Sequence, residues 1–128
     1  MILLLDTSTS LCRLTIVDGE QRYDHQWQAD RQLAHGLLSY IIEQMHAHDF
    51  SWKDLTGIGV MQGPGSFTGL RIGLTVANTI ADAEQLPIVG ATADNWQDEV
   101  TMQLRAGEND KIVLPSYGSD ATITKPRK

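Results

Sequence analysis

The first half of the chain changes its hydrophobic pattern twice. Residues 2–5 form a continuous apolar run, which is typical of a strand buried on both faces. Residues 12–16 and 23–27 alternate apolar or aromatic with polar side chains, and Asp18-Gly19 between them is a hairpin signal. These three runs predict an antiparallel meander of strands. Over residues 31–46 apolar side chains instead recur with a helical period, which predicts an amphipathic helix.

The second half alternates single strands with helices. The pattern predicts a strand at 57–61, a long helix at 70–86 ended by Pro87, a strand at 88–90, a short helix at 94–104 and a last strand at 112–114. An antiparallel set followed by right-handed crossovers gives a mixed sheet with helices packed on it. We therefore predict an α/β fold, a single ribonuclease-H-like lobe of the actin, Hsp70 and sugar-kinase superfamily, in the order βββαβαβ. The lobe is expected over residues 1–114, with an extended tail over residues 115–128.

A glycine-rich stretch at residues 63–73 joins the fourth strand to the long helix. Gly63 and Gly65 allow backbone angles that are closed to other residues, and Ser66 or Thr68 can cap the helix. Such a loop directs N–H groups and the helix dipole toward one point, a geometry suited to an anion. The alternative is a tight turn that only brings helix and sheet close together. A P-loop and a dinucleotide fingerprint are excluded, because no Lys precedes Ser66 and the glycine spacing differs.

The composition limits the cellular environment and the kinds of partner that we expect for this chain. The chain has 128 residues, a net charge of −6 and one cysteine, Cys12, which we expect to be a small core side chain. The negative charge opposes tight unassisted binding to a polyanion, and the only basic cluster is Lys125, Arg127 and Lys128. No apolar run approaches the roughly 20 residues of a membrane span, and the start does not read as a signal peptide. A cytoplasmic protein with no membrane contact is expected.

Three segments resemble one protein family. Leu5-Asp6-Thr7-Ser8-Thr9, residues 63–73 and Leu86-Pro87-Ile88-Val89-Gly90 together resemble the bacterial TsaB proteins, also called YeaZ, over residues 2 to 95 or so. The segment at residues 114–118 resembles the tyrosine-bearing segment that closes members of this family. Only residues 96–113 lie between the region of resemblance and this closing segment, where members of the family usually have a second lobe. The resemblance therefore implies a shortened, single-lobe form.

The resemblance also implies a function. It indicates a non-catalytic scaffold that binds a TsaD-like catalytic subunit, with a TsaE-like ATPase in the assembly, for threonylcarbamoyl transfer to the adenosine beside the anticodon of tRNA. No intrinsic activity or cofactor is expected, ATP would bind only in the assembled complex, and tRNA would be contacted indirectly. A homodimer of the chain alone stays open. Two other functions stay open as well: a minimal nucleotide-binding ATPase or kinase-like lobe active across a homodimer, and an interaction module outside this pathway.

The polar turn after the first strand is the second candidate phosphate loop. Asp6, Thr7 and Ser8 occupy the position of the hairpin that, in the kinase-like superfamily, holds a phosphate or its metal. Together with Gly63, Gly65 and Ser66 it would form phosphate-binding loops, which we expect to be vestigial because a single lobe leaves nothing opposite to enclose a nucleotide. No metal site is expected. The residue four positions after His35 is Ser39 and not a second histidine, so the first helix does not present two histidines to one metal ion. His46 and His48 are close to each other in the sequence, but no third metal ligand is near them.

The long helix has more apolar surface than one sheet can cover. One apolar line contains Phe67, Leu70, Leu74, Ala77 and Ala81, and a second contains Ile72, Val76, Ile80 and Ala83. One line can cover the sheet, and the other must meet the first helix or something outside the chain. We predict a partner interface formed by the second line together with His35 and Ser39 of the first helix. The alternative is that the helix at 31–46 covers the second line completely.

Overall fold

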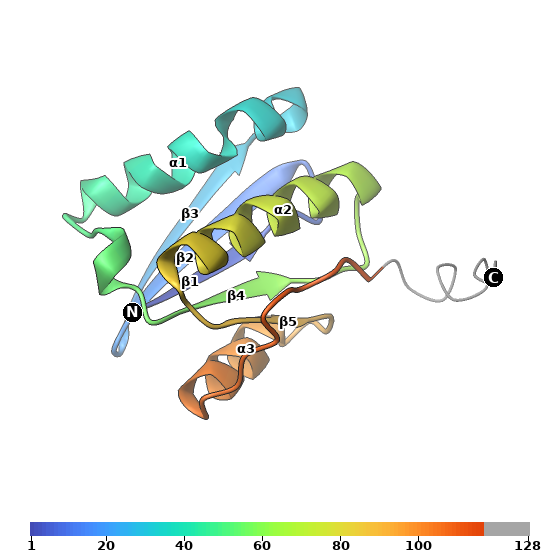
Figure 1. The fold of residues 1–128 in the computed structure, drawn as a ribbon. Helices are drawn as coiled ribbons and strands as arrows, with labels where there is room; N and C mark the ends of the chain where they lie inside the picture. Colours follow the sequence, from blue (N-terminus) through green and yellow to red (C-terminus); the bar gives the residue numbers. More distant parts are fainter. Residues whose placement is uncertain (117–128) are drawn as a thin grey trace.

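Five strands form one mixed sheet in the order β3-β2-β1-β4-β5 (Figure 1). The structure, a computed structural model, describes residues 1–116. The strands are β1 (Ile2–Asp6), β2 (Leu11–Asp18), β3 (Gln21–Gln28), β4 (Gly57–Met61) and β5 (Ile88–Ala91). The predicted meander is confirmed, since β1 pairs antiparallel with β2 and β2 with β3. On the other side of β1, β4 and β5 continue the sheet in parallel pairs.

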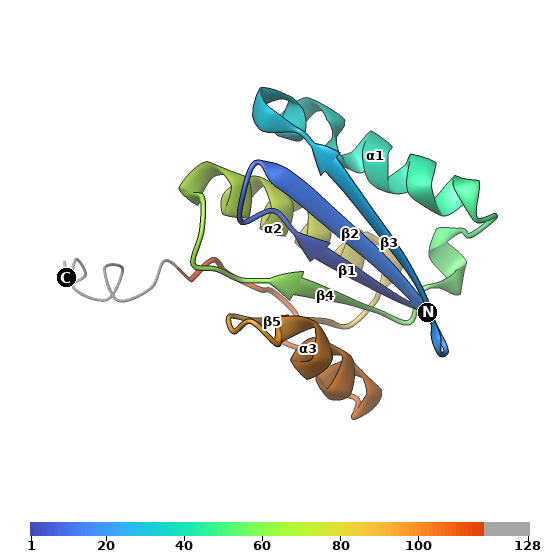
Figure 2. The ribbon, with the colours of Figure 1, turned by 180° about the vertical axis from the view of Figure 1, so that it is seen from behind.

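Three helices cover the two faces of this sheet unequally. The helices are α1 (Leu33–Ala47), α2 (Phe67–Glu84) and α3 (Trp96–Arg105). Figures 1 and 2 show α1 and α2 on one face and α3 on the other, where it packs on β4 and β5. This arrangement confirms the predicted α/β, ribonuclease-H-like lobe. Within residues 1–116, no helix combines the length and the apolar character that crossing a membrane requires.

The central strand β1 serves two hydrophobic cores. Leu3 and Leu5 join the larger core under α1 and α2, while Ile2 and Leu4 join the smaller core under α3. Successive side chains of a strand point to opposite faces. The continuous apolar run of the sequence is therefore explained by helices on both sides of this strand.

The predicted helix ends shift by a few residues for local reasons. Regular α1 begins at Leu33, after a 3₁₀ turn at Asp30–Gln32. Of the two candidate caps of α2, Ser66 takes the role, because its hydroxyl oxygen accepts the N–H of Gly69 at 3.1 Å. The helix ends at Glu84, before Pro87, because Gln85 adopts the left-handed conformation with a φ of 56°.

The predicted strand at residues 112–114 is wrong. This segment is irregular, and the side chain of Asn78 on α2 holds Val113 at both backbone groups. The Val113 N–H donates to Asn78 Oδ1 at 2.9 Å, and the Val113 carbonyl accepts from Asn78 Nδ2 at 2.9 Å. A side-chain amide thus supplies the hydrogen bonds that a neighbouring strand would supply. Val113 itself is buried in the larger core.

The chain remains packed as far as Ser116, whose N–H donates to the carbonyl of Gln62 at 2.8 Å. Most of the predicted tail lies outside the described residues, which end at 116. The same holds for Tyr117 and for the basic cluster of Lys125, Arg127 and Lys128.

Candidate functional site

The two predicted phosphate loops meet at one edge of the sheet. Because β1 and β4 are adjacent and parallel, the turn after β1 and the glycine loop after β4 leave the sheet side by side. The Ser66 N–H donates to the carbonyl of Ser8 at 2.7 Å. The buried hydroxyl of Thr7 donates to the carbonyl of Gly69 at 2.7 Å. We call residues 6–8, the glycine loop and the first turns of α2 the loop cluster.

The carboxylate of Asp6 is engaged within its own turn. Its Oδ1 atom accepts the backbone N–H of Ser8 at 2.9 Å and the hydroxyl of Ser8 at 2.6 Å. This local bonding is the usual way in which an aspartate stabilises a turn two residues ahead. One of its two oxygens is therefore used by the protein itself.

The glycines of the loop cluster are explained by close packing. A Cβ placed on Gly65 would lie 2.6 Å from the carbonyl oxygen of Ser8, and one on Gly73 would overlap the Thr7 hydroxyl. Gly63 has a φ of 123°, which favours glycine. These contacts support the alternative of a tight turn that brings α2 onto the sheet. Phosphate binding by these loops stays a prediction.

An open hollow of about 700 Å³ lies beside the loop cluster. Of the six residues predicted to bind phosphate, Ser66 alone lines it, together with Thr68 and with Thr9, Asp30 and Arg31 across from α2. Hydroxyl groups and one guanidinium could hydrogen-bond a polar ligand there. Within residues 1–116, no group of three or more His, Cys, Asp or Glu side chains is placed to hold a metal ion.

The predicted interface line of α2 borders an apolar groove. Two adjoining hollows, of about 400 and 290 Å³, share Thr75 and Val76 and run between α1 and α2. We call them together the α1–α2 groove. Its main apolar lining residues are Ala34, Leu38, Ile42, Trp52, Ile72, Val76, Ile80 and Ala83. Ile72 and Val76 are half-buried and Ala83 is exposed, whereas Ile80 is only 6% exposed and also belongs to the core.

Part of the predicted interface lies beside this groove. His35 and Ser39 are exposed on α1 and do not line it in the described part of the chain. The groove instead uses Leu38, which is 48% exposed, and Ile42, one turn further on. The sequence indicates both residues, because apolar residues four positions apart on a helix lie on the same side, next to the apolar line that faces the sheet.

Phe67 was predicted to cover the sheet, and that is wrong. Its side chain is 56% exposed at the start of α2, with the guanidinium carbon of Arg71 5.4 Å from the ring centroid. The other members of that line, from Leu70 to Ala81, are buried as predicted.

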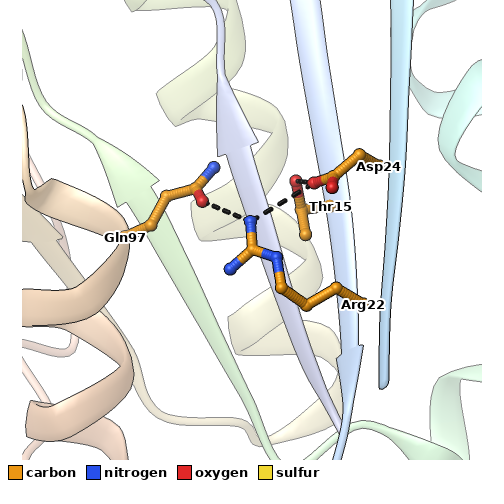
Figure 3. Close-up of polar contacts among 4 residues, drawn as sticks. All are labelled: Thr15, Arg22, Asp24 and Gln97. Carbon is orange, nitrogen blue, oxygen red and sulfur yellow. Dashed lines mark hydrogen bonds and ion pairs between the residues drawn. The ribbon is translucent and has the colours of Figure 1, made fainter. Parts of the chain in front are cut away.

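A polar network ties β3 to α3 on the opposite face (Figure 3). Asp24 Oδ1 accepts the Thr15 hydroxyl at 2.6 Å, and Arg22 Nη2 lies 3.3 Å from the same oxygen. The Arg22 group also donates to Gln97 Oε1 at 2.6 Å. The Thr15 hydrogen bond, and after it the charge of Arg22, hold the pKa of Asp24 below its usual value. The network attaches the first turn of α3 to the outermost strand, a contact that no local sequence pattern predicted.

Cys12 is a core residue, as predicted. It is buried in the larger core, and burial raises the pKa of its thiol to about 12. Burial likewise raises the pKa of Tyr40 to about 12, and the Trp27 ring stacks on Tyr40 with a centroid distance of 5.0 Å. Because both groups stay protonated at neutral pH, neither is a ready nucleophile. Trp27 thus packs against the larger core.

Comparison with known proteins places the chain in a family. The family model of TsaD, tRNA N6-adenosine threonylcarbamoyltransferase, matches residues 27–93, which is more than half of the chain. The tRNA threonylcarbamoyladenosine biosynthesis protein TsaB of Buchnera aphidicola subsp. Baizongia pistaciae is 34% identical over 88 residues, covering 69% of this chain and 40% of that protein. TsaB of Escherichia coli (strain K12) is 29% identical over 91 residues, covering 71% of this chain and 39% of that protein.

A solved structure agrees with these matches. YeaZ from Pseudomonas aeruginosa superposes with a TM-score of 0.67 at 28% identity, covering 71% of this chain and 43% of that chain. The chain thus spans about two fifths of the length of these relatives. The region matched by the family model contains α1 and α2, which form the α1–α2 groove, and the glycine loop, which forms the loop cluster together with residues 6–8. The chain therefore belongs to the TsaB (YeaZ) family, within the wider group that the threonylcarbamoyltransferase family model describes.

Proposed function

We propose that this chain is a non-catalytic scaffold subunit in the biosynthesis of threonylcarbamoyladenosine in tRNA. It binds a TsaD-like catalytic partner through the α1–α2 groove, and a TsaE-like ATPase joins the assembly. With a net charge of −6, the chain contacts tRNA through the partner rather than alone. The setting is the cytoplasm, where tRNA is modified.

The α1–α2 groove is the observation that carries this proposal. Its lining is mostly apolar, and it leaves Leu38 and Val76 accessible on the outer side of the two helices. An apolar groove between two helices is suited to receive apolar side chains from a partner helix. The loop cluster supports the non-catalytic part of the proposal, because the carboxylate of Asp6 and the hydroxyl of Thr7 are engaged within the protein.

The test is capture of the TsaD-like protein encoded by the same genome. Tagged TsaD-like protein is mixed with the untagged chain, either unchanged or carrying Leu38→Glu or Val76→Glu. Binding of the TsaD-like protein would bury the new carboxylate in the groove, where the loss of its hydration would be unfavourable unless a positive group lay beside it. We expect capture of the unchanged chain and at least tenfold weaker capture of both variants. Met102→Glu is the matched control, since Met102 is an apolar residue 66% exposed on α3, on the opposite face. Equal capture of all four proteins would refute the groove as the binding surface.

The enzymatic alternative has its own test. The purified chain with ATP and Mg²⁺ should release no more phosphate than its Asp6→Ala variant. Phosphate release that is lost on Asp6→Ala would contradict the scaffold proposal and favour a minimal nucleotide-binding enzyme. If the chain captures no TsaD-like protein, the interaction module outside this pathway is favoured.

A further inference from the structure

Two histidines far apart in the sequence face each other at the end of α1. His25 lies on the edge strand β3, and His48 immediately follows α1. Their Nε2 atoms are 3.0 Å apart. His46 and His48 are neighbours in the sequence, but in the structure His48 contacts His25 on β3 and His46 is exposed. Both His25 and His48 are half-buried, so solvent and small ions reach them.

Aromatic side chains fix the orientation of this pair. The His48 ring contacts Tyr23 with a centroid distance of 4.3 Å and Phe50 with one of 5.6 Å. The ring nitrogen of an imidazole that carries no proton is the atom that binds a metal.

We propose that His25 and His48 form a two-imidazole site for a late first-row divalent cation such as Zn²⁺ or Cu²⁺, the metals that imidazole suits. With Zn–N bonds of about 2.05 Å and tetrahedral angles, two ligating nitrogens lie about 3.3 Å apart. The observed 3.0 Å is short of this by a few tenths of an ångström, which a small side-chain rotation supplies. Because the described residues place no third ligand nearby, water completes the coordination.

The proton balance of binding is simple. In the hydrogen-bonded pair, one Nε2 carries a proton and the other accepts it. When the cation binds, that proton moves through solvent to Nδ1 of its own ring, so that both Nε2 lone pairs face the metal. The bound ion joins the end of α1 to the edge strand. It binds the folded state only, since His25 and His48 are not held together in the unfolded chain, and it therefore raises the melting temperature.

The experiment uses the full chain with any histidine tag removed. Titration with ZnSO₄ is followed by calorimetry, and the melting temperature is measured with and without excess Zn²⁺. We expect one ion per chain and an increase in melting temperature of about 5 °C. His25→Gln and His48→Gln should each abolish saturable binding, while His35→Gln and His46→Gln, at exposed positions of the first helix, should retain it.

A spectroscopic measurement decides the ligand set without relying on a variant. The electron paramagnetic resonance spectrum of the unchanged chain with one equivalent of Cu²⁺ should show hyperfine splitting from two imidazole nitrogens. A spectrum with one nitrogen or none would overturn the proposal, even if a glutamine variant failed to fold. Absence of saturable Zn²⁺ binding would overturn it as well. So would binding that survives in folded His25→Gln and His48→Gln proteins.

Discussion

The loop cluster and the α1–α2 groove both use α2, and they differ in which of their side chains are still available for binding. At the loop cluster, Thr7, Asp6 and Ser66 have their hydrogen bonds inside the chain. Along the groove, Leu38 and Val76 keep apolar surface in contact with water. The motif that stands out most in the sequence thus builds the fold, whereas the less conspicuous apolar line offers the surface for binding.

Among the changes at the loop cluster, Gly73→Ala should have the largest effect on stability. Helix propensity alone predicts a gain of about 1 kcal/mol for this change in a helix interior. Packing predicts the opposite sign, because the new methyl group would overlap the hydroxyl of Thr7. We expect packing to dominate, with a loss of about 3 kcal/mol in the free energy of unfolding.

Urea denaturation of Gly73→Ala beside Thr75→Ala measures this effect. Thr75 lies on the exposed side of the same helix, so its replacement should change the free energy of unfolding by less than about 0.5 kcal/mol. A stabilised Gly73→Ala protein would mean that the contact between α2 and the β1 turn is looser than described.

Thr7→Val removes one buried hydrogen bond and keeps the shape of the side chain. The carbonyl of Gly69 would lose the hydroxyl that donates to it at 2.7 Å. A loss of about 1–2 kcal/mol is expected, because a buried acceptor is left without a partner. Thr9→Val provides the control in urea denaturation, since Thr9 is exposed in the same turn. Equal effects of the two changes would contradict a special role for Thr7.

Local patterns predicted most of the fold. The alternation of β2, the apolar run of β1 and the turn at Asp18-Gly19 each depend on neighbouring residues, and the structure has all three. The segment around Val113 was wrong because its hydrogen-bond partner, Asn78, lies on a helix 35 residues away. A side chain that replaces a strand leaves no periodic signal in the sequence.

The sequence predicted the position of the candidate site but not its hydrogen bonds. The position of the turn and glycine loop at one edge follows from two parallel strands, so the residues that meet there could be proposed in advance. Their mutual hydrogen bonds could not, because Thr7 and Ser8 can equally bond to solvent or to a ligand. The pairing of His25 with His48 depends on how the end of α1 packs against β3, which no spacing within the sequence reports.

Ser66→Ala should cost less than Thr7→Val. Its hydroxyl oxygen accepts the N–H of Gly69 at 3.1 Å at an exposed helix start. Removing such a cap usually lowers stability by about 1 kcal/mol, and water can partly replace the lost acceptor. Ser66→Asp should restore the stability in the same urea experiment, because aspartate also caps helices and suits the positive end of the dipole. A Ser66→Asp protein no more stable than Ser66→Ala would contradict the capping role.

Leu38→Glu should have the smallest effect on stability, although it should weaken partner capture at least tenfold. Leu38 is 48% exposed at the rim of the groove, so a glutamate there can keep its carboxylate in water when the chain is alone. The free energy of unfolding should therefore change by less than about 0.5 kcal/mol. Leu37→Glu, one residue earlier on the buried side of α1, should instead unfold the chain, because it places a charge in the core. If Leu38→Glu destabilised the isolated chain as severely as Leu37→Glu, the groove would be part of the core, and the contrast with the loop cluster would fail.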